Sequence, residues 1–86
     1  LDRRSQMPLH RQLRRRLALA IETGELAPGE LLPSVRQLAA RVGVNRLTAL
    51  KALQALRRAG LVHNRRGRGY YVADRSARDD VGEEDR

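Results

Sequence analysis

An 86-residue chain with 18 Lys and Arg against 10 Asp and Glu, and hence a net charge of +8, is expected to bind a polyanion such as nucleic acid. Its length allows one domain with a small core, which must be aliphatic because Phe and Trp are absent. The lack of Cys excludes disulfides and thiolate metal sites, and no apolar run approaches the ~20 residues of a membrane span. We therefore expect a cytoplasmic protein.

The first predicted helix runs from about Pro8 to Thr23, after a polar segment, residues 1–6, that we expect to be flexible. Proline suits the first turn of a helix, and Gly24 suits a left-handed cap at the other end. Apolar residues recur at intervals of three and four along one stripe: Leu9, Leu13, Leu17, Ala20 and Ile21. Leu19 lies off this stripe, and we interpret it as an exposed side chain rather than a dimer contact.

A second, shorter helix is predicted to begin after Ser34 and to end at Gly43. Gln37, three residues after Ser34, completes a capping box. The residues predicted to face inward lie on one side of this helix: Val35, Leu38, Ala39 and Val42. Before the helix, Pro28-Gly29 is typical of a turn, and Leu31-Leu32 is a candidate for one short strand added to a hairpin.

The third predicted helix is capped by Asn45 and closed by Gly60. At 100° per residue, four apolar residues fall on its inner face: Ala49, Ala52, Leu53 and Leu56. Three residues fall on the opposite face: Leu47, Lys51 and Arg58. Leu50 lies at the margin between the faces. The helix thus begins with a basic and polar outer surface that Leu47 interrupts.

Residues 60–72 contain β-branched and aromatic residues on both sides of a basic, glycine-containing centre, a pattern typical of a β-hairpin. Neighbouring residues of a strand point to opposite faces, so one of Tyr70 and Tyr71 should pack inward, and we expect it to be Tyr71. Residues 74–86 hold three Arg against six Asp and Glu, a net charge of −3, and almost nothing apolar. We expect them to be a disordered acidic tail or the start of a linker.

The two middle elements, residues 34–56, have the outline of a DNA-reading helix-turn-helix, because a short helix and a Gly-containing turn precede a helix with a basic first turn. The hairpin that follows would supply a wing. The predicted fold is mainly α with a small β-wing, a winged helix-turn-helix of three helices plus a β-hairpin, over residues 7–73.

Several motifs occur in a fixed order along the chain: Pro8-Leu9, Gly24-Glu25-Leu26, Pro28-Gly29, Leu32-Pro33-Ser34-Val35-Arg36-Gln37-Leu38-Ala39, Gly60-Leu61 and Arg66-Gly67-Arg68-Gly69. Together they resemble the winged-helix domain of the GntR family of bacterial transcriptional regulators, over roughly residues 7–73. Within the third helix, Val44-Asn45, Thr48 and Lys51-Ala52 are most similar to the YtrA-type branch, and the HutC-type branch is close.

The resemblance implies which residues contact DNA. Arg36, at the start of the second helix, would reach bases or phosphates, and the wing tip, Arg66-Gly67-Arg68, would lie at the minor groove. The residues that open the third helix would enter the major groove: Asn45, Arg46, Thr48 and Lys51. Leu47 and Leu50 depart from the family pattern, which has a polar residue at the first position and, in some branches, a base-reading arginine at the second.

The chemistry of the residues supports the same set. Arg36 and Arg46 stand beside helix N-termini, which favour phosphate, and a guanidinium can hold a guanine edge with two hydrogen bonds. Ser34 has a first role as a cap, with phosphate contact by its hydroxyl as a second. Leu47 has two open interpretations, contact with a thymine methyl or no role. Hairpin geometry exposes the candidate wing residues: Arg65, Arg66 and Arg68.

The predicted function is sequence-specific binding of double-stranded DNA by a transcriptional regulator, most simply a repressor. Helix 45–59 would occupy the major groove, and wing 65–69 would lie at the minor groove. The alternative is an architectural or protein-interaction winged helix that binds any duplex similarly. An enzyme is not predicted, because His10 and His63 are isolated and no acidic pair lies in an apolar setting.

Partners and cofactors follow from the same resemblance. It implies a second domain after the wing, where a small-molecule effector would bind, so no cofactor is expected in residues 1–86. The operator would be palindromic. We expect the free chain to be a monomer, paired on DNA or through a missing C-terminal domain, because its apolar stripes are needed for a single core.

Overall fold

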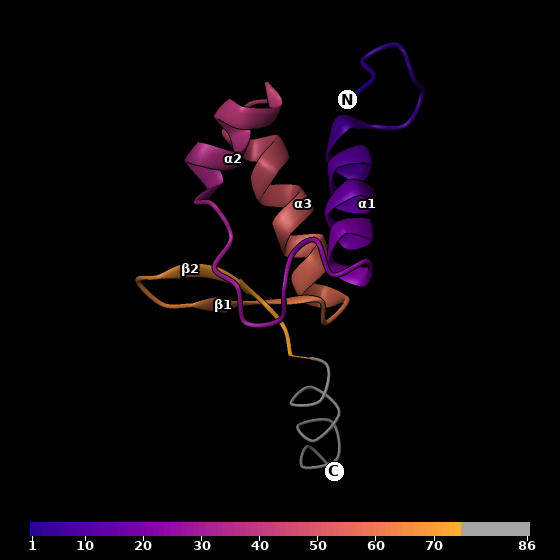
Figure 1. The fold of residues 1–86 in the computed structure, drawn as a ribbon. Helices are drawn as coiled ribbons and strands as arrows, with labels where there is room; N and C mark the ends of the chain where they lie inside the picture. The colour runs from indigo at the N-terminus through magenta and orange to yellow at the C-terminus, as the bar shows by residue number, and fades with distance from the viewer. Residues whose placement is uncertain (75–86) are drawn as a thin grey trace.

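The computed structural model describes residues 1–74, which fold into three helices followed by a hairpin. The elements in chain order are α1 (Leu9–Glu22), α2 (Val35–Val42), α3 (Arg46–Arg58), β1 (Val62–Arg65) and β2 (Gly69–Val72). Figure 1 shows α3 between α1 and α2, with the hairpin beside the C-terminal end of α3. The predicted winged helix-turn-helix is confirmed. Apart from Asp74, the predicted acidic tail lies outside the described residues.

Helix α1 is shorter by one residue at each end than its sequence pattern predicted. Pro8 is the N-cap, and its carbonyl accepts hydrogen bonds from the next turn, while Thr23 is the C-cap. Gly24 follows with φ of +86°, as expected for a left-handed residue after a helix. Leu13 is the one fully buried residue of the predicted stripe. Three more α1 residues are partly buried and pack against the core: Leu17, Ala18 and Ile21. Ala18 was not part of the predicted stripe.

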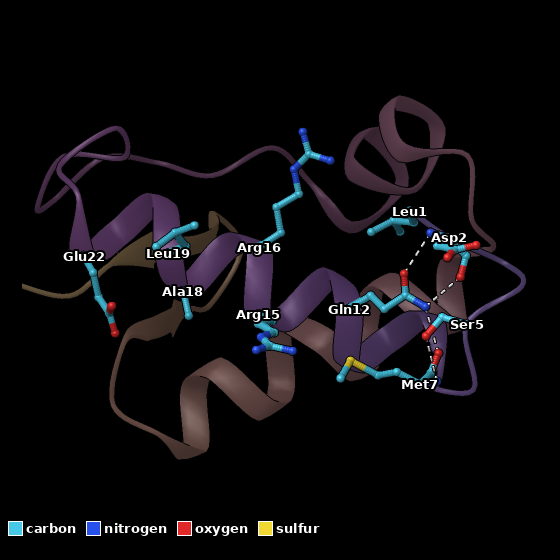
Figure 2. Close-up of a pocket in the computed structure, with 10 residues that line it drawn as sticks. All are labelled: Leu1, Asp2, Ser5, Met7, Gln12, Arg15, Arg16, Ala18, Leu19 and Glu22. Carbon is cyan, nitrogen blue, oxygen red and sulfur yellow. Dashed lines mark hydrogen bonds between the residues drawn. The ribbon is translucent and has the colours of Figure 1, made fainter.

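The segment before α1 is folded back onto the first turns of that helix. Gln12 holds it in place, because its Nε2 donates to the carbonyls of Asp2 and Met7, and its Oε1 accepts from the Asp2 N–H, all at 2.8 Å (Figure 2). The Arg3 guanidinium also donates to the Gly43 carbonyl at the end of α2. Residues 1–6 therefore make defined contacts in this structure, which their polar composition did not indicate.

The core lies where α1, α2, α3 and the hairpin meet, and it is aliphatic except for one tyrosine. Its buried residues are Leu13, Leu32, Leu38, Ala39, Ala49, Ala52, Leu53, Leu56, Val62, Tyr70 and Val72. All four residues predicted for the inner face of α3 belong to it. Val35 and Val42 of α2 are half-buried and pack against it, as does Leu26 of the preceding loop.

The hairpin corrects the assignment of the two tyrosines. Tyr70 is 8% exposed and belongs to the core, whereas Tyr71 is half-buried on the outer face. The register pairs Val62 with Val72, both buried, and residues two apart on a strand share a face. Tyr70 therefore points inward with Val72. The prediction of Tyr71 for the core was wrong, because the buried Val72 determines which of the two tyrosines points inward.

A segment before α2 pairs with the free edge of β2. The Leu32 N–H donates to the Tyr70 carbonyl at 2.8 Å, and the Val72 N–H donates to the Glu30 carbonyl at 2.9 Å. The bridge between Leu31 and Tyr71 is too short to count as a strand, although the sequence pattern placed a candidate strand there. The edge of the wing is thus covered by the loop that leads into α2.

Candidate nucleic-acid interface

The N-terminus of α2 is built by the predicted capping box. The Ser34 hydroxyl accepts the Gln37 N–H at 3.0 Å, and the Gln37 side-chain oxygen accepts the Ser34 N–H at 3.1 Å. This arrangement leaves the Ser34 O–H proton to donate outward. Arg36 is exposed in the first helical turn, where the helix dipole is positive. This end of α2 suits an anionic ligand.

The turn between α2 and α3 sets the angle of the helix pair. Gly43 has φ of +74°, and the N–H groups of Gly43 and Val44 both donate to the Ala39 carbonyl, at 2.9 and 3.0 Å. Asn45 then caps α3, because its Oδ1 accepts the Thr48 N–H at 2.8 Å. The cap uses the Asn45 oxygen and leaves its amide NH₂ group to donate elsewhere.

The exposed start of α3 carries the residues predicted for the major groove. Arg46, Leu47 and Lys51 are exposed, whereas Thr48 is half-buried and is thus the least accessible of the predicted α3 contacts. A surface hollow of about 570 Å³ is lined by residues from the N-terminal ends of α2 and α3. It brings together four predicted site residues and two that were not predicted, Val35 and Leu50. Its full lining is Ser34, Val35, Arg36, Arg46, Leu47 and Leu50.

Lys51 does not line this hollow; it lines a groove of about 490 Å³ that α3 shares with α1. The lining of this groove is basic and contains no acidic residue: His10, Arg11, Arg14, Lys51, Gln54, Ala55 and Arg58. The sequence pattern leaves Arg11 and Arg14 outside the apolar stripe of the first helix. It could not show that they stand beside Lys51, because that depends on how α1 packs on α3.

The wing tip holds three exposed arginines in two different settings. The Arg65 guanidinium carbon lies 5.7 Å from the ring centroid of Tyr71, whose ring also stacks on His63 at 5.7 Å. Arg66 and Arg68 flank Gly67, which has φ of +77°, in a turn closed by the Arg68 N–H and the Arg65 carbonyl at 2.9 Å. Arg65 therefore lies along the hairpin face, whereas Arg66 and Arg68 form its tip.

A third hollow, of about 750 Å³, lies along the outer side of α1 and has a different character (Figure 2). Its charged residues are of both signs: Asp2, Arg15, Arg16 and Glu22. None of its lining residues comes from α2, α3 or the hairpin. This hollow lacks the uniformly positive lining of the other two, so we do not include it in the interface.

Two further features of residues 1–74 bear on the kind of site. No group of three or more His, Cys, Asp and Glu side chains in this part of the chain is placed to hold a metal ion. No helix within the same residues is long and apolar enough to cross a membrane.

Three helices, a left-handed turn between the last two and a basic hairpin define a winged helix-turn-helix protein. Residues 9–72 match the family described as "Bacterial regulatory proteins, gntR family", and the chain belongs to this family. The HTH-type transcriptional repressor YtrA of Bacillus subtilis is 36% identical over 74 residues, which cover 86% of this chain and 57% of that protein. The chain therefore spans little more than half the length of this relative.

Two solved structures agree with this assignment. YtrA from Sulfolobus acidocaldarius, a GntR-family transcription factor, has a TM-score of 0.79 and 34% identity, covering 96% of this chain and 90% of that one. The AraR DNA-binding domain in complex with operator ORE1 has a TM-score of 0.76 and 29% identity, covering 85% of this chain and 89% of that one.

Proposed function

We propose that this chain binds double-stranded DNA in a sequence-specific manner, as the DNA-binding part of a transcriptional regulator. Helix α3 enters the major groove, and the wing tip lies at the minor groove. The observation that carries the proposal is the hollow between α2 and α3, where Arg36 and Arg46 stand at two adjacent helix N-termini with no acidic residue in the lining. Membership of a family of bacterial regulatory proteins supports it.

The polar and basic groups around this hollow favour base reading over purely electrostatic attachment. Guanidinium groups can hold guanine edges, and the free amide of Asn45 can pair with an adenine edge or a phosphate. A winged helix used for architecture would need only the charge. We therefore propose direct contacts of Ser34, Arg36, Asn45, Arg46, Leu47, Thr48 and Lys51 with the major-groove side, and of Arg65, Arg66, Gly67 and Arg68 with the minor-groove side.

Selection of binding sites from random duplexes by the 86-residue chain tests this proposal. We expect a discrete preferred site that is palindromic, with specific binding ~10³-fold or more tighter than binding to unrelated duplex. Equal affinity for all duplexes with a purely electrostatic salt response would instead identify an architectural module. Footprinting on the selected site then shows whether the protected region has two half-sites.

The biological role proposed is that of a repressor in the bacterial cytoplasm, which the repressor named among its relatives supports. Regulation by DNA binding needs no catalytic group, and we propose that residues 1–86 bind no cofactor. An effector, where the regulator uses one, would bind outside these residues. Reporter transcription from a promoter that carries the selected site, with and without the regulator, tests the sign of regulation.

A further inference from the structure

The hollow between α2 and α3 is lined by apolar and cationic side chains together. Leu47 and Leu50 lie three residues apart on one side of α3, and Val35 faces them from α2. Arg36, Arg46 and Ser34 complete the lining. Leu47 is 59% exposed, an unusual position for a large aliphatic side chain in the middle of a basic surface. The folded chain gains little from an aliphatic side chain there.

The positive charge of the lining restricts what can occupy this hollow. An occupant beside two guanidinium groups and two helix N-termini should be anionic as a whole, yet it must present an apolar group at the point of contact. The major groove of duplex DNA meets both conditions. Between its two phosphate strands, the edge of a base pair carries one apolar group, the C5-methyl of thymine.

We propose that Leu47 and Leu50 form a methyl-reading site that receives the C5-methyl group of a thymine in each half-site. This inference rests on the proposed function and adds to it which base the apolar part of α3 recognises. Arg36 and Arg46 hold the flanking phosphates or guanine edges, and they thereby place the thymine methyl against the leucines. Burial of one methyl-sized group corresponds to about a fourfold change in affinity.

The test replaces single thymines of the selected site with deoxyuridine, which lacks only the C5-methyl. We expect one thymine per half-site at which uracil weakens binding of the 86-residue chain about fourfold. A 5-methylcytosine·guanine pair at that position should bind more tightly than unmodified cytosine·guanine by a similar factor, because its methyl occupies the same place. This second comparison separates the contribution of the methyl group to affinity from that of the thymine O4 atom.

Variants assign the methyl contact to its residue. With Leu47→Ala the difference in affinity between the thymine and uracil duplexes should shrink, and with Leu47→Ala/Leu50→Ala it should disappear. Leu19→Ala is the matched control, since Leu19 is 60% exposed on α1 away from this hollow, and it should keep the full difference. Circular dichroism melting confirms that each variant is folded. For each variant, the ratio of the thymine to the uracil affinity is compared with the same ratio for the native chain. Any effect of uracil on DNA shape is common to both ratios and cancels, so the remaining difference reports the methyl contact.

Two results would overturn the inference while the proposed function stands. The first is equal binding of thymine and uracil duplexes at every position of a site that is otherwise bound specifically. The second is a thymine preference that persists in the double leucine variant, which would assign the methyl to another residue. Failure to select any preferred site would refute the proposed function itself.

Discussion

The two faces of α3 differ in almost every property, although they belong to the same thirteen residues. On the inner face, Ala49, Ala52 and Leu53 are completely buried between α1 and α2. On the outer face, Arg46, Leu47 and Lys51 are exposed. The inner face determines where the helix lies, and the outer face determines what it can contact. Substitutions on the two faces should therefore affect different measurements.

The largest effect is expected on the inner face. Leu53→Ala removes a fully buried side chain and should lower the free energy of unfolding by ~2–5 kcal/mol, because it leaves a cavity in a small core. Leu47→Ala makes the same chemical change on the outer face and should alter stability by less than about 0.5 kcal/mol. Urea denaturation followed by circular dichroism measures both. Equal losses would mean that Leu47 is packed in solution.

The next effect is expected on the outer face, in binding alone. Arg46→Ala should weaken binding to the selected site by ~1–3 kcal/mol and relax the preference at one base pair, with the melting temperature unchanged. Arg15→Ala removes the same charge from the outer side of α1 and should weaken all duplexes slightly and equally. Titrations with the selected and a scrambled duplex measure this. Unchanged affinity and preference in Arg46→Ala would show that α3 does not read bases.

Asn45 caps α3 and is also a proposed DNA contact, so its variants can separate an effect on stability from an effect on binding. Asn45→Ala removes the cap of α3 and should lower the free energy of unfolding by ~1 kcal/mol. Asn45→Ser keeps a capping oxygen and should retain most of the stability, but it lacks the amide NH₂ that we propose contacts DNA. Reduced specific binding by a stable Asn45→Ser variant is the expected outcome. If the serine variant binds as well as the native chain, Asn45 acts as a cap only.

The wing extends the comparison to a second element. Arg66→Ala/Arg68→Ala should reduce the slope of log affinity against log salt by about 1 to 2 and remove a preference for A·T-rich flanks. Arg65→Ala should have a smaller effect on the salt slope and on the flank preference, because Arg65 lies against Tyr71 rather than at the tip. Binding at several salt concentrations, with A·T and G·C flanks, provides the measurement. An unchanged slope in the double variant would place the tip away from DNA.

The smallest effect concerns self-association. The exposed large apolar residues of the described chain lie on four separate segments: Leu1, Leu19, Leu31 and Leu47. A stable dimer typically needs more than ~1,000 Å² of buried surface, so we expect a monomer in the absence of DNA. Sedimentation at high micromolar concentration should show one species, unchanged by Leu47→Ala. A dimer that Leu47→Ala dissociates would mean that the outer face of α3 is a subunit contact.

Local signals allowed much of the fold to be predicted. Ser34 and Gln37 form the expected capping box, α2 ends at Gly43 as expected, and the inner face of α3 follows from its helical period. The choice between Tyr70 and Tyr71 failed, because the prediction did not use the spacing of two that places Tyr70 on the same face of β2 as the buried Val72.

In the candidate site too, features set by a single element could be predicted, whereas features set by packing between elements could not. The exposure of Arg46 and of the wing tip could be predicted, since each follows from one helix or one hairpin. The shared hollow of Val35, Leu47 and Leu50 could not, because it exists only once α2 packs beside α3. The contact between Arg65 and Tyr71 likewise depends on the pairing of two strands. Whether these residues contact DNA stays a prediction.

The pairing between the loop before α2 and strand β2 has a mechanical consequence. Leu32 is hydrogen-bonded to Tyr70 at 2.8 Å, and Pro33 alone separates Leu32 from Ser34 at the start of α2. Proline restricts the one joint between them. The hydrogen bonds to β2 and the fixed φ of Pro33 therefore restrict how the wing can move relative to the start of α2. On a duplex, the contacts proposed for these two elements would keep a nearly constant spacing in base pairs.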